Sequence, residues 1–170
     1  AFTDAEDALV AKVRDNIDAE TVVFLLMSDT HASNDATYEQ SVLARKLAER
    51  IGADAIVHLG DMIDENPKSG TDGSLDRLMR YMEGTAASNI PFLHAIGHHE
   101  KYGSVIYPAN EADFRYYLTN NLVAGITVRS YDKHLHAVRD VSNVFNYYVD
   151  FDFQHLRCIF VDSVYMRWGM

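Results

Sequence analysis

Apolar residues in the first hundred positions form short continuous runs separated by amphipathic segments. The runs lie within residues 21–31, 53–64 and 91–100, and each ends in polar residues. They lack alternation of apolar and polar positions, which is typical of strands buried on both faces. Strands that alternate with helices in this way predict parallel βαβ units, because a parallel connection needs a long crossover.

Helical spacing of apolar residues marks the segments around these strands. Residues 4–14 predict a short helix, and residues 37–53 predict a longer one that ends at Gly52. Residues 75–87 predict a third helix, which Ser74 can cap after a turn-rich loop.

The pattern changes in the second half of the chain. Residues 110–121 predict a short aromatic-rich helix. Residues 144–153 and 156–163 predict two antiparallel strands joined around Gln154 and His155. The predicted fold is therefore α/β, a βαβαβ parallel sheet followed by antiparallel strands, in one domain over residues 1–170.

Composition narrows the classes of function. The chain has 170 residues and a formal charge of −10, so its surface repels phosphate backbones and a nucleic-acid scaffold is not expected. No apolar stretch is long enough to predict a membrane span. The chain begins at Ala1 without a signal-like segment, which leaves open a cytoplasmic location or export after leader removal.

Candidate chemistry lies where the first three strands end. These ends carry Asp29 and His31, then Asp61, then His98, His99 and Glu100. Ligands of open α/β sheets bind outside the carboxyl ends of the strands, so these side chains are expected at one edge. Imidazole and carboxylate ligands together favour Zn, Mn or Fe over an oxygen-only Mg or Ca site.

Residue spacing supports this interpretation. Asp29 and His31 are two apart, so in an extended backbone they would point the same way and could bind one ion. Gly60 and Gly97 would allow sharp turns and a close approach of the backbone to an ion or phosphate.

The motifs "SDTH", "HLGDMID" and "IGHHE" resemble, in order, the strand-end motifs of the calcineurin-like metallophosphoesterase superfamily. The stretch "NYYVDFDFQHLRCIFVDS" is similar to the following pair of strands in purple-acid-phosphatase-like members. The resemblance covers nearly the whole chain and implies half of an α/β sandwich of the metallophosphoesterase type.

The resemblance also implies roles for individual residues. Asp29 and His31 would bind a first metal, Asp61 would bridge two metals, and residue 98 would bind the second. His99 would protonate the leaving alcohol or stabilise the phosphoryl oxygen, oriented by Glu100. A metal-bound hydroxide would attack phosphorus. Asp64 would support one of the metal ligands.

Two departures from the family pattern affect these expectations. His98 stands where the family has asparagine, which leaves open an altered ligand or a non-binding residue. The family's later Gly-His and Gly-His-x-His motifs have no counterpart, since no histidine follows His155. The chain is therefore expected to be the N-terminal part of the domain, with an apolar face covered by the missing C-terminal half or by self-association.

Two functions follow from the sequence. The first is a metal-dependent phosphoesterase that hydrolyses phosphate mono- or diesters, with two metals in the complete family domain and one or none here. The alternative is a non-catalytic domain that binds metal weakly or serves only in assembly. His58 and His94 are interpreted as core histidines, although either could also support a residue of the metal site. An aromatic cluster in the second half of the chain is interpreted as core: Phe145, Tyr147, Tyr148, Phe151 and Phe153.

Overall fold

The computed structural model describes residues 2–32, 35–62, 83–84, 89–95, 97, 99, 126–132, 137–140 and 146–161. The helices and strands bounded within these residues are α1 (Asp4–Arg14), β1 (Phe24–Met27), α2 (Asp35–Ile51), β2 (Ala55–His58), β3 (Phe92–His94), β4 (Ile126–Asp132), β5 (Ala137–Asp140), β6 (Tyr147–Phe151) and β7 (Leu156–Phe160). Within them, no helix combines the length and apolar character needed to span a membrane.

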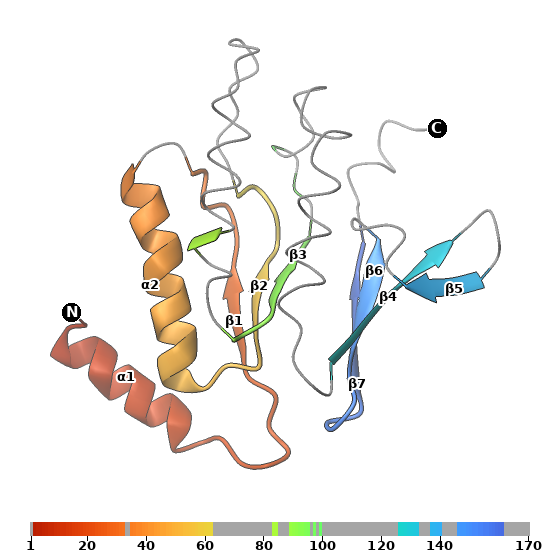
Figure 1. The fold of residues 1–170 in the computed structure, drawn as a ribbon. Helices are drawn as coiled ribbons and strands as arrows, with labels where there is room; N and C mark the ends of the chain where they lie inside the picture. Colours follow the sequence, from red (N-terminus) through yellow and green to blue (C-terminus); the bar gives the residue numbers. More distant parts are fainter. Residues whose placement is uncertain are drawn as a thin grey trace, which may run out of the picture.

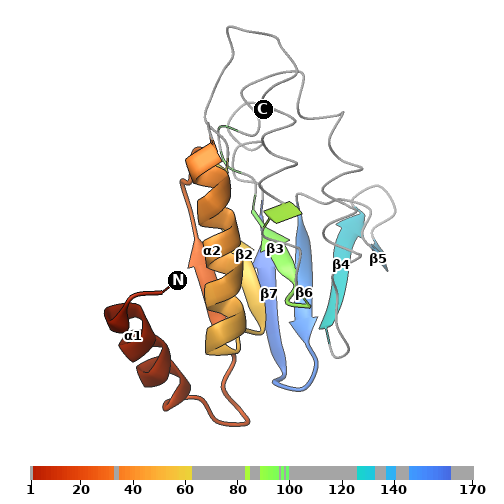
Figure 2. The same cartoon turned by 60° about the vertical axis from the view of Figure 1, so that its left-hand side comes forward.

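The first sheet is parallel, as the alternation of strands and helices predicts. Its strand order is β1-β2-β3, and Met27, His58 and His94 occupy matching positions near the carboxyl ends of the three strands. Helix α2 covers one face of this sheet, and the second sheet lies on the other side (Figures 1 and 2). The central strand β2 is buried along its whole length, which explains its continuous apolar sequence.

The second sheet is antiparallel with the order β5-β4-β6-β7. The predicted pairing of the last two strands is confirmed, and the turn at residues 152–155 joins them. Strands β4 and β5 are an addition that the sequence pattern did not predict. Their segment carries interspersed charges and short runs, so apolar alternation is weak there.

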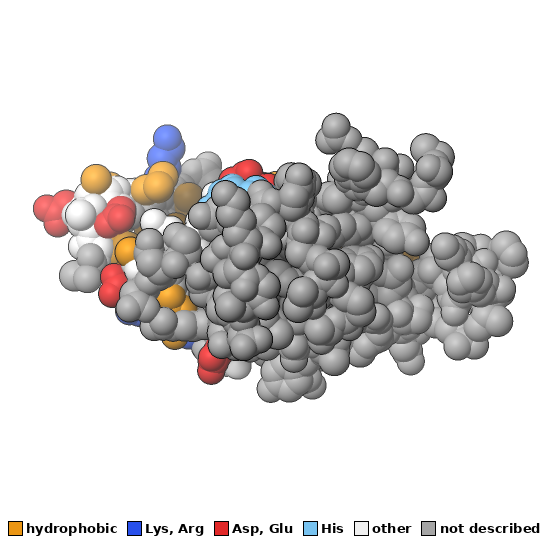
Figure 3. All heavy atoms as spheres, turned by 90° about the horizontal axis from the view of Figure 1, so that it is seen from above, with side chains coloured by type: hydrophobic (Ala, Val, Ile, Leu, Met, Phe, Trp, Pro, Cys, Tyr) orange, Lys and Arg blue, Asp and Glu red, His pale blue; other side chains and the backbone are white. Residues whose placement is uncertain are grey.

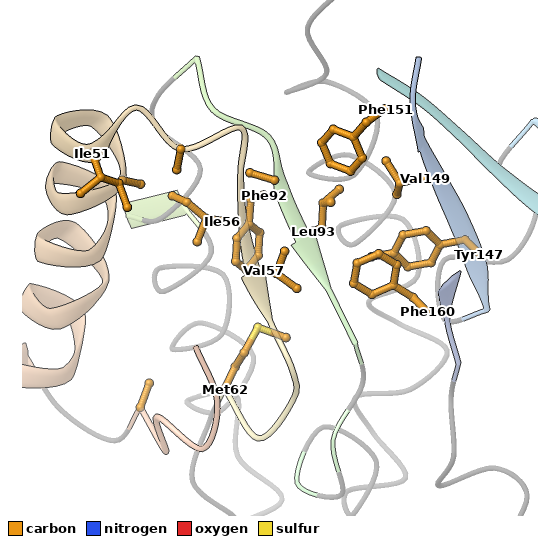
Figure 4. Close-up of a cluster of buried hydrophobic side chains, with 14 of the residues drawn as sticks. Ile51, Ile56, Val57, Met62, Phe92, Leu93, Tyr147, Val149, Phe151 and Phe160 are labelled. Carbon is orange, nitrogen blue, oxygen red and sulfur yellow. The ribbon is translucent and has the colours of Figure 1, made fainter. Parts of the chain in front are cut away.

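The hydrophobic core extends from α2 across the first sheet to the second sheet. Leu93 of β3 points toward Val149 and Phe151 of β6 (Figure 4). The rings of Phe24 and Phe151 lie 5.2 Å apart between centroids, so β1 also reaches the second sheet. Burial alternates along β6 because successive side chains of a strand point to opposite faces.

The aromatic cluster predicted as core is only partly buried. Tyr147 and Phe151 are buried, and the Tyr147 ring stacks on Phe160 at 4.6 Å. Phe153 is 76% exposed in the β6–β7 turn, so this prediction was wrong. Tyr148 points to the other face of β6, where the Arg157 guanidinium lies 4.2 Å from its ring centroid. Phe145 lies outside the described residues.

Tyr147 also makes a polar contact across the sheets. Its hydroxyl donates to the His94 carbonyl at 2.6 Å and accepts from the His94 N–H at 2.9 Å. The next residue, Ala95, donates instead to His58 of β2. Because neighbouring strand residues direct their backbone groups to opposite sides, Tyr147 satisfies the edge of β3 that faces away from β2.

Helix α1 packs against α2 with one buried residue, Val10. A capping box between Thr3 and Glu6 begins it, and Arg50 of α2 holds Asp7 at 2.5 Å. Both predicted helices, over residues 4–14 and 37–53, are confirmed to within two residues of their ends.

Two further predicted helices fall largely outside the described residues. In the helix predicted over residues 75–87, only Glu83 and Gly84 are described, and both are helical. Ser74 and residues 110–121 lie outside the description.

Candidate metal centre

The carboxyl ends of β1, β2 and β3 meet at one edge of the first sheet. Figure 3 views this edge from above and shows histidine and acidic side chains next to each other at the surface. The turns after the strands carry the candidate residues, as expected for ligand sites in parallel sheets.

Backbone hydrogen bonds hold the first two turns together beyond the ends of the strands. Asp29 N–H donates to the Gly60 carbonyl at 3.1 Å, and His31 N–H donates to the Asp61 carbonyl at 3.1 Å. Ala32 N–H then donates to the Met62 carbonyl at 2.8 Å. The two turns therefore form a single bonded unit.

Three predicted ligands have left-handed backbone conformations. The φ angles are 52° at Asp29, 45° at His31 and 53° at Asp61, and Gly60 before Asp61 has φ 108°. Such conformations cost on the order of 1–3 kcal/mol at a non-glycine residue and cluster at functional sites. The extended backbone expected between Asp29 and His31 is therefore wrong, and this turning explains why β1 ends at Met27.

Three donor side chains come together at the edge. Nitrogen atoms of His31 and His99 and a carboxylate oxygen of Asp61 all lie within 4.8 Å of one another, and all three residues are half-buried. The imidazole rings of His31 and His99 meet edge to face, with centroids 4.5 Å apart and planes at 82°. The His99 N–H donates to Asp61 Oδ1 at 2.8 Å, which fixes the third turn to the second.

Gly97 permits this approach. A Cβ atom at position 97 would overlap the Asp61 backbone nitrogen and Oδ1. The sequence predicted that the backbone at this glycine approaches an ion or phosphate; in the structure it approaches Asp61.

The donor set fits a divalent transition metal. Two imidazoles and one carboxylate are ligands that Zn, Mn and Fe accept, whereas Mg and Ca prefer oxygen alone. Two donors on one ion at about 2.0–2.2 Å can be at most about 4.4 Å apart. The observed spread of up to 4.8 Å thus needs only a small movement of the side chains.

The other predicted site residues are placed differently. Asp29 is exposed, lies outside the three-donor cluster and accepts a hydrogen bond from the Ser28 hydroxyl. His98, Glu100 and Asp64 lie outside the described residues. Their roles remain predictions.

Thr30, which the sequence reasoning passed over, connects the turns from below. Its hydroxyl donates to the Met62 carbonyl and lies 3.0 Å from His58 Nε2. His58 is buried, as predicted, and burial lowers its pKa to about 4 although Asp29 and Asp61 favour the protonated form. The sequence signal that could have identified Thr30 is its position between the two predicted ligands Asp29 and His31.

A match to a known protein family identifies the kind of domain that carries this edge. The family described as calcineurin-like phosphoesterase matches residues 22–164, well over half of the chain. The chain belongs to the calcineurin-like phosphoesterase family. No curated protein and no solved structure gave a significant match.

Family membership agrees with the observed fold and site. The matched residues of this phosphoesterase family member include all the described strands, whereas α1 precedes the match. Membership confirms the predicted α/β class and implies the use of divalent metal ions. The cluster of His31, Asp61 and His99 lies inside the matched region.

Proposed function

We propose that the chain is a metal-dependent phosphoesterase, or the N-terminal part of one, that hydrolyses phosphate mono- or diesters. The observation that carries this proposal is the convergence of His31, Asp61 and His99 from three strand ends. A divalent transition metal bound there would supply Lewis acidity toward a phosphoryl oxygen and lower the pKa of water.

The chain's own residues have separate tasks in this proposal. His31 and Asp61 would hold the metal, and Asp29 and His98 would complete two metal sites if a second ion binds. His99 donates a proton to the leaving alcohol oxygen while the oxygen of water bonds to phosphorus and the bond from phosphorus to the alcohol oxygen breaks. The proton that water loses goes to solvent, from which His99 is protonated again. Glu100 orients His99, and Asp64 supports a ligand.

His99 is the residue whose task most needs a test. Its nearness to His31 and Asp61 suits either a proton donor beside the metal or a third metal ligand. We assign it the proton donor role, because the family motif it matches places the catalytic acid there. An acid contributes roughly 10²–10⁴-fold to the rate without being needed for metal binding.

The experiment measures aryl phosphate hydrolysis and Mn²⁺ affinity in parallel. Asp61→Asn should lose both, with affinity falling by more than about 100-fold because a direct ligand is removed. His99→Asn should keep Mn²⁺ affinity and lose at least about 100-fold in rate. The matched control is His155→Asn, since His155 is exposed in the β6–β7 turn and has a left-handed backbone that asparagine tolerates.

Each outcome has a distinct meaning. If His99→Asn also abolishes Mn²⁺ binding, His99 is a ligand and its role as the acid is wrong. If the wild-type chain binds Mn²⁺ with no turnover, the chain by itself is a metal-binding domain without catalytic activity.

A further inference from the structure

His58 lies directly beneath the two turns that carry His31 and Asp61. It is the last residue of β2 and has no exposed surface. Its Nδ1 accepts a hydrogen bond from the Gly60 N–H at 3.2 Å, and its Nε2 lies 3.0 Å from the Thr30 hydroxyl. One buried side chain therefore touches both turns.

The hydrogen bonds define the tautomer of His58. Because Nδ1 accepts from Gly60, a neutral ring must carry its proton on Nε2. Independently, the single Thr30 hydroxyl hydrogen goes to the Met62 carbonyl at 3.0 Å, so the Thr30 oxygen must accept from His58. Both constraints give the same series of hydrogen bonds: Gly60 donates to His58, His58 donates to Thr30, and Thr30 donates to Met62.

This series of hydrogen bonds contacts the turns next to their strained residues. Thr30 stands between Asp29 and His31, both left-handed, and Gly60 immediately precedes the left-handed Asp61. Left-handed non-glycine residues persist only where their surroundings hold them. Burial of an imidazole is unfavourable unless it is hydrogen-bonded, and an apolar side chain could fill the same space without that requirement.

We propose that His58 and Thr30 are positioning residues that hold the two turns in the conformation required for His31 and Asp61 to bind a metal. This proposal rests on the proposed metal function of the cluster. Neither residue is required as a ligand, and each acts through the backbone of the turn that it contacts.

Substitutions at Thr30 separate the hydroxyl from its packing. Thr30→Val keeps the side-chain shape and removes the hydroxyl, whereas Thr30→Ser keeps the hydroxyl. We expect Thr30→Val to weaken Mn²⁺ binding by about 10-fold or more, the usual effect of losing a residue that supports ligands, and Thr30→Ser to stay near wild type. Electron paramagnetic resonance of free Mn²⁺ measures both affinities.

Thr21→Val is the matched control. Its hydroxyl also makes a hydrogen bond, to Asp18 at 2.6 Å, but in the loop before β1 and not at the metal edge. It should leave Mn²⁺ affinity unchanged. Unfolding of all the variants in EDTA shows whether a variant loses Mn²⁺ affinity only because it is less stably folded. An unchanged Mn²⁺ affinity in Thr30→Val would overturn the proposal.

A second measurement needs no substitution. Long-range ¹H–¹⁵N spectra of the metal-free chain at neutral pH should show His58 neutral with its proton on Nε2, and a proton on Nδ1 would overturn the chain of hydrogen bonds. If the wild-type chain fails to bind Mn²⁺, both the metal site and this proposal fail. If it binds Mn²⁺ without turnover, only the proposed hydrolysis fails, and the Thr30 variants still decide the positioning role.

Discussion

Left-handed backbone at Asp29, His31 and Asp61 shows how the local conformation serves the site. Aspartate and histidine tolerate this conformation better than most residues, so residue types suited to binding a metal also suit the sharp turns. The turns end the strands early and let His31 and Asp61 approach His99. A valine or isoleucine at any of the three positions would be strained and would offer no metal ligand.

His58 makes stability depend on pH. Burial lowers its folded-state pKa to about 4, below the ordinary 6.5, while Asp29 and Asp61 oppose that shift. Between these two pH values the unfolded chain binds a proton that the folded chain does not, so the free energy of unfolding rises with pH and levels off above 6.5. Acidification below pH 4 should remove roughly 3 kcal/mol from this residue alone.

Urea unfolding in EDTA between pH 4.5 and 6.5 checks this dependence. His58→Gln should flatten the rise relative to wild type, because glutamine does not titrate. The two proteins differ only at position 58, so the comparison isolates His58. Equal slopes would show that His58 is protonated in the folded chain at its ordinary pKa.

At the scale of elements, β3 depends on a side chain from the other sheet. The Tyr147 hydroxyl serves both backbone groups of His94, and burial raises the pKa of Tyr147 well above its ordinary value. The phenol therefore stays protonated and can always donate. This contact ties β3, which leads to Gly97 and His99, to β6.

Removal of that hydroxyl should destabilise the chain. Tyr147→Phe leaves the His94 N–H and C=O without this buried partner, and we expect a loss of about 1–3 kcal/mol in urea unfolding. Tyr148→Phe is the control, because Tyr148 is on the opposite face of the same strand and phenylalanine keeps a ring for Arg157. The control should change stability by less than about 0.5 kcal/mol. A similar loss in both variants would mean that the Tyr147 hydroxyl is not what holds β3.

At the scale of the whole molecule, apolar side chains remain exposed along β7 and in the segments directly before and after it. Phe153 is 76% exposed, Ile159 72% and Val161 49%, and β7 is the last strand of the described sheet. Exposed apolar surface favours association. The expectation that a partner piece or a second copy covers part of the chain stays a prediction.

Sedimentation of the purified chain checks this prediction. The wild type should sediment as more than a monomer or together with a second polypeptide, and Ile159→Lys should shift it toward the monomer, because the charge opposes burial of the strand face. Arg157→Lys changes the neighbouring position without changing its charge and serves as the control. A wild-type chain that is monomeric and alone at every concentration contradicts the expectation.

The sequence alone predicted the order of the first elements and the residues that could carry chemistry. Continuous apolar runs identified β1, β2 and β3, because strands buried on both faces need no polar positions. The polar residues that end these runs identified His31, Asp61 and His99, because parallel strands deliver their carboxyl ends to one edge. The strand pair β6 and β7 followed from alternation.

The tertiary structure decided which of these residues meet. It brought His31, Asp61 and His99 together and left Asp29 outside the cluster, because the distances depend on left-handed turns that no residue pattern specifies. It also assigned the polar contacts of Thr30, His58 and Tyr147, which join segments far apart in the chain. Strands β4 and β5 likewise depend on pairing with β6, a long-range interaction that local periodicity does not record.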